Sequence, residues 1–548
     1  MQFENNIIHR PETSNLYCEQ PSLAHLIIKN LTSAGDKTLI VCGITGKEIS
    51  ARELLSNSIQ IAKALTVHGI RQGDVVSIIS ENRFEFVYAL LGTIFLNCTV
   101  APLNHTYSQR ELEHALNLSK PKFVFTGGST AELIVNIAGE LNYVKKIILF
   151  DDNGLRPTNG LTVSLQDFTS EQSLRNVQFK PLPVNVATST CVIMCSSGTT
   201  GLPKGVQISQ SGIIVTARQS KEFLYGPSNV GDADIVILGL LPMFHVFGAA
   251  VLICTIVTLS GKIIMLPKFE EVTFLGCIEK YRCSVAFLVP PLMVFLAKNS
   301  LVDKYDLSSL RFIMSGAAPL SKELEQSVKD RLQIPNLVIK QGYGMTELTV
   351  SVLSQKDFVK SGSVGDINSG AYVKVCDDAG NALGPNQVGE LCFKGSTMMI
   401  GYIGDKAATS AMIDSDGWLH TGDVGYYDND LQFFIVDRIK ELIKCKGFQV
   451  PPAEIEALLL THPKIKDCGV IGKPDEMAGE LPLAFIVRND PNLTKTEILK
   501  YVSDKASPAK RLHGGVIFVD EIPKNPSGKI LRRQLREQLA QLEMKSKL

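Results

Sequence analysis

The chain reads Ser196-Ser197-Gly198-Thr199-Thr200-Gly201-Leu202-Pro203-Lys204-Gly205 at the point that decides its fold. An apolar run precedes this stretch and an alternating run follows it, so the stretch is predicted to be a loop between two strands. Its glycines let backbone N–H groups approach an anion closely, its hydroxyls donate hydrogen bonds, and Lys204 adds a positive charge. The Gly-Lys-Ser/Thr ending of the Walker loop is missing. The composition therefore predicts either a phosphate-binding loop of another kind or a flexible turn.

The whole ten-residue string resembles the adenylation signature of acyl- and aryl-CoA ligases, 4-coumarate:CoA ligases and beetle luciferases. Further segments resemble motifs of the same family, in the same order and spacing: Phe244–Gly248, Ser315–Leu320, Gln341–Glu347, Gly389–Cys392, Trp418–Asp423, Lys444–Val450 and Pro523–Lys529. By these motifs the chain is identified as a member of the acyl-adenylate-forming (AMP-binding) superfamily, similar to insect luciferase-like fatty acyl-CoA synthetases, beetle luciferases and 4-coumarate:CoA ligases.

Strand-like and helical runs alternate from Ala24 to about Ile435. Short apolar runs predict buried strands at 75–79, 99–103, 123–125, 146–150 and 263–266, and amphipathic patterns predict helices such as 53–68 and 272–281. This alternation is typical of parallel sheets covered by helices on both faces. We therefore predict an α/β fold: a large N-terminal domain of helix-covered sheets with a β-rich subdomain, and a smaller, mobile α+β domain at the C-terminus.

A short charged turn, Asp437-Arg438-Ile439-Lys440, separates an aromatic-rich β region from a shorter α+β unit. Such turns often serve as hinges between domains. We predict a large adenylation domain over 1–436, a hinge at 437–440, and a small catalytic lid domain over 441–548. The resemblance implies that the small domain rotates about this hinge between two half-reactions.

The resemblance implies an ATP site, because adenylation requires a carboxylate to meet the α-phosphate, so that charge neutralisation and alignment are the main catalytic tasks. The expected nucleotide-binding residues are Ser196, Ser197, Gly198, Thr199, Thr200, Gly201, Lys204, Gly316, Ala317, Ala318, Gln341, Gly342, Tyr343, Asp423 and Arg438. Tyr343 would face adenine, and Asp423 would accept hydrogen bonds from the ribose hydroxyls. Glu347 would help to hold Mg²⁺, and Thr346 would donate to the α-phosphate.

Two lysines of the small domain are expected to act in different half-reactions. Lys529 would neutralise charge around the α-phosphate during adenylation, although a lysine in a Gly/Pro turn is by default a solvated charge. Lys444 would be presented after the rotation, when the thiol of coenzyme A attacks the acyl-adenylate; ordinary surface charge is the alternative for Lys444 and Lys446.

The acyl pocket is expected to be lined by His245, Phe247, Ala317 and Val350. We group His245 with the catalytic residues Lys529, Lys444, Thr346 and Glu347, but we do not expect it to be a general base, because a carboxylate substrate is already ionised. A core histidine bonded to a backbone carbonyl is the alternative.

The predicted activity is that of an acid–thiol ligase that activates a medium- or long-chain fatty acid as acyl-AMP and transfers it to coenzyme A. One alternative is a 4-coumarate-type arylpropenoate:CoA ligase, and another is a luciferase-like monooxygenase with weak luminescence. Departures from the light-emitting pattern disfavour the latter: Leu348-Thr349-Val350-Ser351 after Glu347, Thr216 where luciferases place an arginine, and Ala317 where they have glycine. The acyl chain length is left open.

Composition narrows the partners. The 548 residues carry 55 basic and 55 acidic side chains, with no basic run interleaved with aromatics, so nucleic acid is not an expected partner. Twelve scattered cysteines without metal spacing fit a reducing compartment. Two charge-free stretches, 86–109 and 235–261, are interrupted by Pro, Gly or Asn, so we expect core elements and no transmembrane segment.

The ending Ser546-Lys547-Leu548 predicts recognition by the peroxisomal import receptor. We also expect a monomer.

Overall fold

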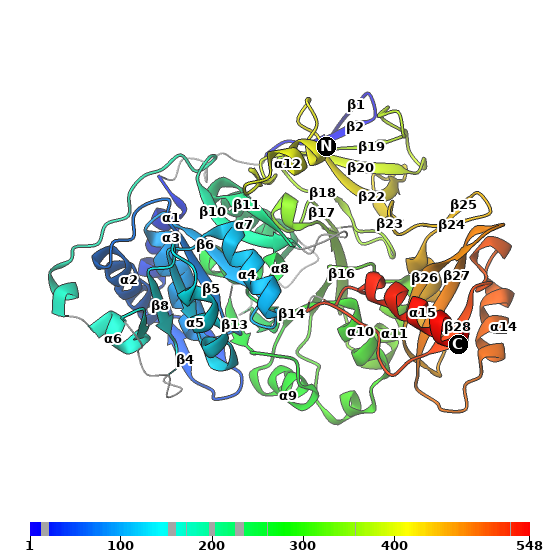
Figure 1. Ribbon diagram of the computed structural model, residues 1–548, viewed down its shortest axis with the longest axis horizontal. Coiled ribbons are helices and arrows are strands. Elements are labelled where there is room, and N and C mark those ends of the chain that lie inside the picture. Colours follow the sequence, from blue (N-terminus) through cyan, green and yellow to red (C-terminus); the bar gives the residue numbers. More distant parts are fainter. Residues whose placement is uncertain are drawn as a thin grey trace.

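The computed structural model describes residues 1–12, 21–151, 160–170, 172–196, 203–224, 235–259, 261–356, 358–526 and 528–547. Within these ranges the strands form four sheets (Figure 1). Two large sheets and a six-stranded sheet come from residues up to 438, and a five-stranded sheet comes from the residues that follow. The predicted mixed α/β fold is thus confirmed.

The first large sheet contains the strands on both sides of the glycine-rich loop. Its order is β21 (Gly401–Tyr402), β11 (Lys204–Ser209), β10 (Thr190–Ser196), β6 (Thr99–Leu103), β5 (Val75–Ile79), β7 (Phe123–Thr126), β8 (Lys146–Leu149) and β9 (Thr162–Ser164). The pairs from β10 to β9 are parallel, as the sequence predicts. The β10–β11 and β11–β21 pairs are antiparallel.

The second large sheet has nine strands. Its order is β18 (Asp366–Ile367), β17 (Leu353–Ser354), β16 (Val338–Tyr343), β15 (Phe312–Ser315), β14 (Val285–Leu288), β12 (Val236–Gly239), β13 (Lys262–Met265), β3 (Thr38–Cys42) and β4 (Glu48–Ser50). The run from β16 to β3 is parallel, and both ends of the sheet are antiparallel. The expected parallel sheets therefore carry antiparallel edges.

Helices cover both faces of each large sheet. One core joins strands of both sheets to the helices between them: α1 (Leu23–Ala34), α2 (Ala51–Val67), α3 (Phe84–Phe95), α7 (Gln210–Leu224) and α8 (Val246–Thr258). Outside the first sheet lie α4 (Gln109–Ser119) and α5 (Ala131–Gly139); outside the second lie α9 (Glu271–Tyr281), α10 (Pro290–Lys298) and α11 (Lys322–Leu332). The charge-free stretches form α3 with β6, and β12 with α8, as predicted. Among the described residues no helix has the length and apolar character needed to cross a bilayer.

The six-stranded sheet combines residues from the two ends of the large unit. Its order is β1 (Gln2–Glu4), β2 (Ile7–Arg10), β19 (Ala371–Cys376), β20 (Gly389–Gly395), β22 (Leu419–Tyr427) and β23 (Phe433–Arg438), and α12 (Lys406–Met412) lies between β20 and β22 in the chain. Figure 1 shows the N-terminus beside β19 and β20. The sequence gives no sign of this pairing, because β1 and β2 have only three and four residues.

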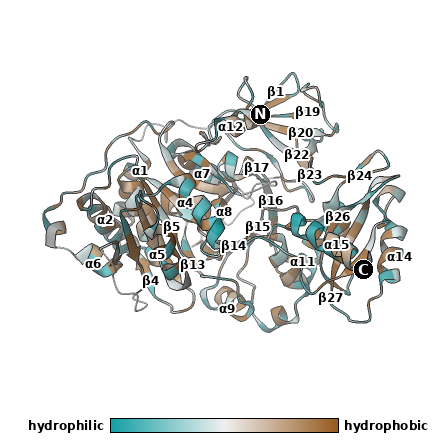
Figure 2. Ribbon diagram, viewed as in Figure 1, coloured by the Kyte–Doolittle hydropathy of each residue, from teal (hydrophilic) through white to brown (hydrophobic). Residues whose placement is uncertain are grey.

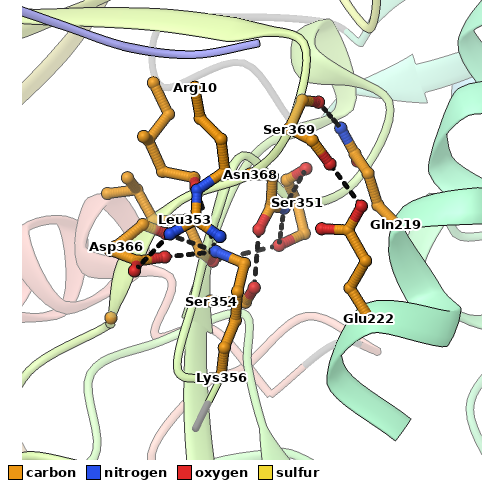
Figure 3. Close-up of polar contacts among 12 residues, drawn as sticks. Arg10, Gln219, Glu222, Ser351, Leu353, Ser354, Lys356, Asp366, Asn368 and Ser369 are labelled. Atoms are coloured by element: carbon orange, nitrogen blue, oxygen red, sulfur yellow. Dashed lines mark hydrogen bonds and ion pairs between the residues drawn. The ribbon is translucent and has the colours of Figure 1, made fainter. Parts of the chain in front are cut away.

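A buried polar cluster fastens the N-terminal strand to the edge of the nine-stranded sheet (Figure 3). Arg10 donates to Asp366 at 2.8 Å, and Lys356 forms an ion pair with the same carboxylate. Burial lowers the pKa of Lys356 to about 8, although the charge of Asp366 opposes the shift. Nearby, Gln219 and Glu222 of α7 bind Ser369. Ion pairs removed from water in this way cost several kcal/mol if one partner is lost.

The C-terminal unit packs helices against a five-stranded sheet. Its order is β25 (Phe448–Val450), β24 (Ile443–Cys445), β27 (Gly479–Arg488) and β26 (Ile465–Asp475), with β28 (Gly515–Phe518) paired to β27. The helices are α13 (Pro452–Leu460), α14 (Lys495–Lys505) and α15 (Arg532–Lys547). Figure 2 shows hydrophobic residues along the strands of the sheets and mainly hydrophilic residues along α15. The exact domain boundaries stay a prediction.

Candidate active site

A cavity of about 540 Å³ collects most of the predicted site residues. It lies where the glycine-rich hairpin, the six-stranded sheet, the ends of β15 and β16 and the C-terminal unit meet. The predicted residues in its lining are Ser196, Lys204, His245, Phe247, Gly316, Ala317, Gly342, Tyr343, Thr346, Glu347, Val350, Arg438 and Lys529. These positions span more than 330 residues of sequence, so the fold brings them together.

A second cavity of about 840 Å³ adjoins the first and lies between the large and C-terminal units. Ala318, Gln341 and Asp423 line this second cavity. Tyr343 and Lys529 line both cavities. The two spaces thus meet at the groups expected to face the adenine and the α-phosphate.

Some predicted residues are not brought to this place. Ser197, Gly198, Thr199, Thr200 and Gly201 lie outside the described residues. Ser196 of β10 and Lys204 of β11, which flank them in the chain, are paired. Lys444 is exposed on β24, where its backbone N–H donates to Glu480 at 2.8 Å, and the described lining of neither cavity includes it.

Parallel strand register positions the nucleotide-facing segments. Ser315 at the end of β15 lies opposite Gln341 near the end of β16, so the segments that follow leave the same edge of the sheet. Gly344 passes so close to the next turn that a Cβ there would lie 1.8 Å from the carbonyl oxygen of Val350. Ala317 and Val350 both have positive φ, 70° and 90°. Such conformations cost about 1–3 kcal/mol for a non-glycine residue and cluster at functional sites.

Three side chains form a fixed polar group between the cavities. The hydroxyl of Tyr343 donates to Asp423 at 2.6 Å, and Nε of Arg438 lies 3.1 Å from the other oxygen of the same carboxylate. Burial raises the pKa of Tyr343 well above its usual value, and the charge of Asp423 adds to the shift. Asp423 is therefore an anchored acceptor with lone pairs left for further donors.

Gln341 adds a donor in need of an acceptor. Its side-chain oxygen accepts from the backbone N–H of Leu320 at 3.1 Å, whereas its Nε2 is buried without a hydrogen-bond partner among the described residues. Buried polar groups are nearly always paired, so an unpaired donor in a cavity lining favours a ligand at that place.

Tyr402 is a site residue that the sequence reasoning missed. Its hydroxyl donates to Glu347 at 2.8 Å, and Nζ of Lys204 lies 4.6 Å from the centre of its ring. Tyr402 thus joins the predicted metal ligand to the predicted phosphate-binding lysine. No local signal marks it, because Gly401-Tyr402 is a two-residue strand whose partner, β11, lies about 200 positions earlier.

The surroundings of Glu347 fit Mg²⁺. The carboxylate is buried, lines the cavity beside Thr346, and gives one of about four lone-pair sites to Tyr402. Mg²⁺ prefers one or two carboxylates together with water and phosphate oxygens. Glu347 could therefore hold this ion if nucleotide phosphates supplied the remaining ligands.

Lys529 comes to the cavity on a turn of the C-terminal unit. Asn525 shapes that turn: its side chain accepts from the backbone N–H of Lys529 at 2.9 Å, and its own N–H donates to the Lys529 carbonyl at 2.9 Å. Gly528 packs against Pro291 so closely that a Cβ would lie 3.1 Å from the proline ring. Burial, followed by the charge of Arg438, lowers the pKa of Lys529 to about 8.

His245 caps α8 and lines the first cavity. Its Nδ1 accepts from the backbone N–H of Phe247 at 3.3 Å, and burial lowers its pKa to about 4. The imidazole is therefore neutral at physiological pH. The apolar residues in the lining of this cavity are Val246, Phe247, Met314, Met345, Val350, Ala408, Ala411 and Met412.

The chain matches the AMP-binding enzyme family over residues 29–403 and the AMP-binding enzyme C-terminal domain over residues 454–529. It is 40% identical over 511 residues to luciferin 4-monooxygenase of Photinus pyralis, covering 91% of both chains. It is 39% identical over 533 residues to a probable 4-coumarate–CoA ligase of Dictyostelium discoideum, covering 95% of this chain and 96% of the relative.

Solved structures agree with this relationship. ATP-bound MatB from Rhodopseudomonas palustris superposes with a TM-score of 0.81 at 25% identity, covering 94% of this chain and 98% of the other. The fold also matches the anthranilate CoA ligase AuaEII in complex with anthranoyl-AMP, with a TM-score of 0.84 at 23% identity over 94% and 97% of the two chains. Family matches cover most of the chain and several relatives are close to 40% identical, so this protein belongs to the acyl-adenylate-forming superfamily of AMP-binding enzymes.

Proposed function

We propose that the protein is an AMP-forming acyl-CoA synthetase that activates medium- or long-chain fatty acids. One observation carries the proposal: a single cavity is lined by both charged and apolar groups. Lys204, Glu347, Arg438 and Lys529 line it together with aliphatic and sulfur-containing side chains. A fatty acid likewise combines an anionic head with an apolar chain.

In the first half-reaction the carboxylate oxygen attacks the α-phosphorus of ATP, the bond to the β-phosphate breaks, and pyrophosphate leaves. Lys204 and the hydroxyls of the glycine-rich loop would hold the β- and γ-phosphates. Lys529 would neutralise charge at the α-phosphate, and Thr346 would donate to it. Mg²⁺ bound through Glu347 would offset negative charge on the phosphates.

Around the nucleoside, the anchored Asp423 would accept from the ribose hydroxyls with Arg438 beside it. Tyr343 would present its ring to adenine, and Nε2 of Gln341 would find an acceptor there. Gly316, Ala317, Ala318 and Gly342 would form the backbone walls of this part of the site. His245 would line the acyl pocket as a neutral group.

In the second half-reaction the thiol sulfur of coenzyme A attacks the acyl carbonyl, and AMP leaves. We propose that the C-terminal unit rotates about 437–440 for this step, withdraws Lys529 and brings Lys444 to the cavity. The exposed position of Lys444 in the present arrangement is compatible with this proposal.

A 4-coumarate-type arylpropenoate:CoA ligase is the second candidate, supported by relatives of that name at 37–39% sequence identity, such as 4-coumarate–CoA ligase 1 of Petroselinum crispum, 37% identical over 548 residues. A luciferase-like oxygenase is less well supported. At the position where luciferases place an arginine, Thr216 is buried and donates to the backbone carbonyl of Thr349 at 3.2 Å. A heteroaromatic substrate would thus lack that donor.

The decisive experiment measures AMP formation with ATP, Mg²⁺ and coenzyme A, for acetate, octanoate, laurate, palmitate, 4-coumarate and luciferin. We expect CoA-dependent turnover of laurate or palmitate. Lys529→Ala is the inactive reference, and Lys304→Ala, which removes an exposed lysine outside both cavities, is the control for loss of charge alone.

Each other result selects another function. Turnover of 4-coumarate without turnover of fatty acids would replace the proposal by the aromatic ligase. AMP release without coenzyme A, accompanied by light from luciferin, would replace it by the oxygenase.

Peroxisomal import through Ser546-Lys547-Leu548 and the monomeric state stay predictions. A fluorescent protein fused in front of residues 532–548 would be compared with the same fusion lacking the last three residues. Cytosolic fluorescence from both fusions would contradict the localisation, and light scattering of the purified chain would test the monomer.

A further inference from the structure

A cluster of side chains that could bind a metal ion lies on the six-stranded sheet, at the lining of the 540 Å³ cavity, which is called the nucleotide cavity below. The candidate ligand atoms of Glu390, Cys392 and His420 all lie within 4.8 Å of one another. Nδ1 of His420 is 2.8 Å from Oε2 of Glu390 and 3.4 Å from Sγ of Cys392. One imidazole nitrogen thus faces a carboxylate and a thiol at once.

The strand register places these side chains together and adds a second thiol. Cys392 of β20 lies directly opposite His420 of β22, and Glu390 precedes Cys392 by two residues, so the side chains share one face. On the other side of β20, Cys376 of β19 lies opposite Glu390. The thiols of Cys376 and Cys392 are joined by a hydrogen bond, and both are buried. Three adjacent strands therefore supply two sulfurs, one nitrogen and one carboxylate.

A second set of groups orients the first, as is usual around bound metals. Nε2 of His420 lies 3.3 Å from Oδ2 of Asp414, so a carboxylate stands behind the imidazole and favours a proton on Nε2. Oε1 of Glu390 accepts from the backbone N–H of Gly422 at 2.9 Å. This bond fixes one carboxylate oxygen and leaves Oε2 turned toward the histidine. Nδ1 of His420 is thus placed to bind an ion, and Nε2 can donate to Asp414, as is usual for a metal-binding histidine.

Two of the distances between ligand atoms are close to those around a tetrahedral ion. Zinc–sulfur and zinc–nitrogen bonds imply distances of roughly 3.3–3.8 Å between neighbouring ligand atoms in a tetrahedron. The sulfur–nitrogen distance of 3.4 Å is within this range, and the nitrogen–oxygen distance of 2.8 Å requires only a small opening. Glu390 and His420 line the 540 Å³ cavity, which gives an ion a path from solvent.

We propose that Cys376, Cys392, His420 and Glu390 bind one borderline-soft divalent cation of the zinc type. Thiolate and imidazole ligands select such an ion over Mg²⁺, which prefers oxygen. Binding releases the thiol protons and the proton between His420 and Glu390 to solvent, and no electron is transferred. This cation site is separate from Glu347 and does not depend on which acid the enzyme activates.

The test uses the folded full-length chain, dialysed against Zn²⁺ in excess Mg²⁺ so that oxygen-rich sites are filled by Mg²⁺. We expect one zinc per chain by elemental analysis. With Co²⁺ in its place, we expect the thiolate-to-metal absorption and ligand-field bands of a tetrahedral site. Zinc affinity should fall at least about tenfold in Cys376→Ser and in His420→Gln.

The matched control is Cys283→Ala, which removes a buried cysteine of another core. It should bind zinc as the unmodified chain does. Thermal unfolding of each variant without metal separates loss of the site from loss of the fold. Zinc binding far below one equivalent, or equal binding by the double variant Cys376→Ser/Cys392→Ser, would overturn the proposal.

Zinc binding at this site should change the affinity of the nucleotide cavity for AMP. This prediction rests on the proposed function. His420 and Asp423 lie three residues apart on β22, and Glu390 holds the N–H of Gly422 between them. A cation would restrain this part of β22. Zinc should therefore tighten AMP binding severalfold in the unmodified chain and not in Cys376→Ser. Calorimetry measures both affinities. Zinc binding with unchanged AMP affinity would overturn the coupling and leave the cation site standing.

Discussion

The two walls of the nucleotide cavity are built in different ways. The sheet wall consists of Tyr343, Asp423 and Arg438, which are joined to one another by short polar contacts on strands. The turn wall is Lys529, on a turn of the C-terminal unit where the side chain of Asn525 accepts from its backbone N–H. The side chains expected to bind the nucleoside are held on strands of the large unit. The position of the Lys529 ammonium group depends instead on how the large and C-terminal units meet. Affinity and rate should therefore respond to different substitutions.

Removal of the Lys529 ammonium group from the turn wall should have the largest effect. In Lys529→Ala we expect acyl-AMP formation to fall by about 10²–10³-fold, because charge at the α-phosphate loses a preorganised partner. Transfer of a preformed acyl-adenylate to coenzyme A should change little. Pyrophosphate exchange measures the first step and rapid quench the second. Equal losses in both steps would contradict the division of work between the walls.

Neutralising the sheet wall should affect binding more than rate. Asp423→Asn removes the charge that Tyr343 and Arg438 share, so AMP affinity should weaken about 10–100-fold, the range for a charge-assisted hydrogen bond. Tyr343→Phe is the matched control, since it keeps the ring and removes one bond to the carboxylate. Its loss should be smaller. If the phenylalanine variant lost as much as the asparagine variant, the anchoring role of Asp423 would be wrong.

The pH dependence should also separate the walls. The lowered pKa of Lys529, about 8, means that the amine is cationic below that pH and neutral above it. The value of kcat/KM for adenylation should therefore decline above pH 8, by about tenfold per pH unit, because it reports the free enzyme. In Lys529→Arg, whose side chain stays charged, this decline should vanish. A decline of the same shape in the arginine variant would assign it to another group.

The smallest effect should come from the contact that helps to place the turn wall. Nζ of Lys298, at the end of α10, donates to the carbonyls of Leu460 at 2.7 Å and Ile465 at 2.9 Å across the junction between the units. In Lys298→Met, adenylation should slow about 2–10-fold while thiol transfer does not, because the proposed rotation of the C-terminal unit would break these bonds before thiol transfer. The exposed Lys304→Met is the control. Slower thiol transfer in Lys298→Met would refute this role.

Local patterns predicted the large sheets well, and they failed where contacts join distant residues. The strand at 75–79 has the predicted bounds, because a continuous apolar run between turn signals is sufficient for a buried strand. The β2–β19 pair could not be predicted, since it joins residues more than 350 positions apart without a local signal.

The same contrast holds for the site. Family motifs named Glu347 and Lys204, but not Tyr402, which connects them. Neither Lys298 nor Cys376 lies in a motif, and each gains its partners only from packing or strand register. For the glycine-rich loop itself the sequence predicts a phosphate-binding role, and residues 197–202 lie outside the described residues.

The place of the N-terminal strand also has a consequence for synthesis on the ribosome. Arg10 leaves the ribosome 356 residues ahead of its partner Asp366. At about 5–20 residues per second, the strand waits roughly 20–70 s before its sheet can form. During that time Ile8, fully buried in the finished protein, is exposed to solvent. Strand β2 is thus made long before it can fold, and a chaperone that holds this segment of the nascent chain would protect it.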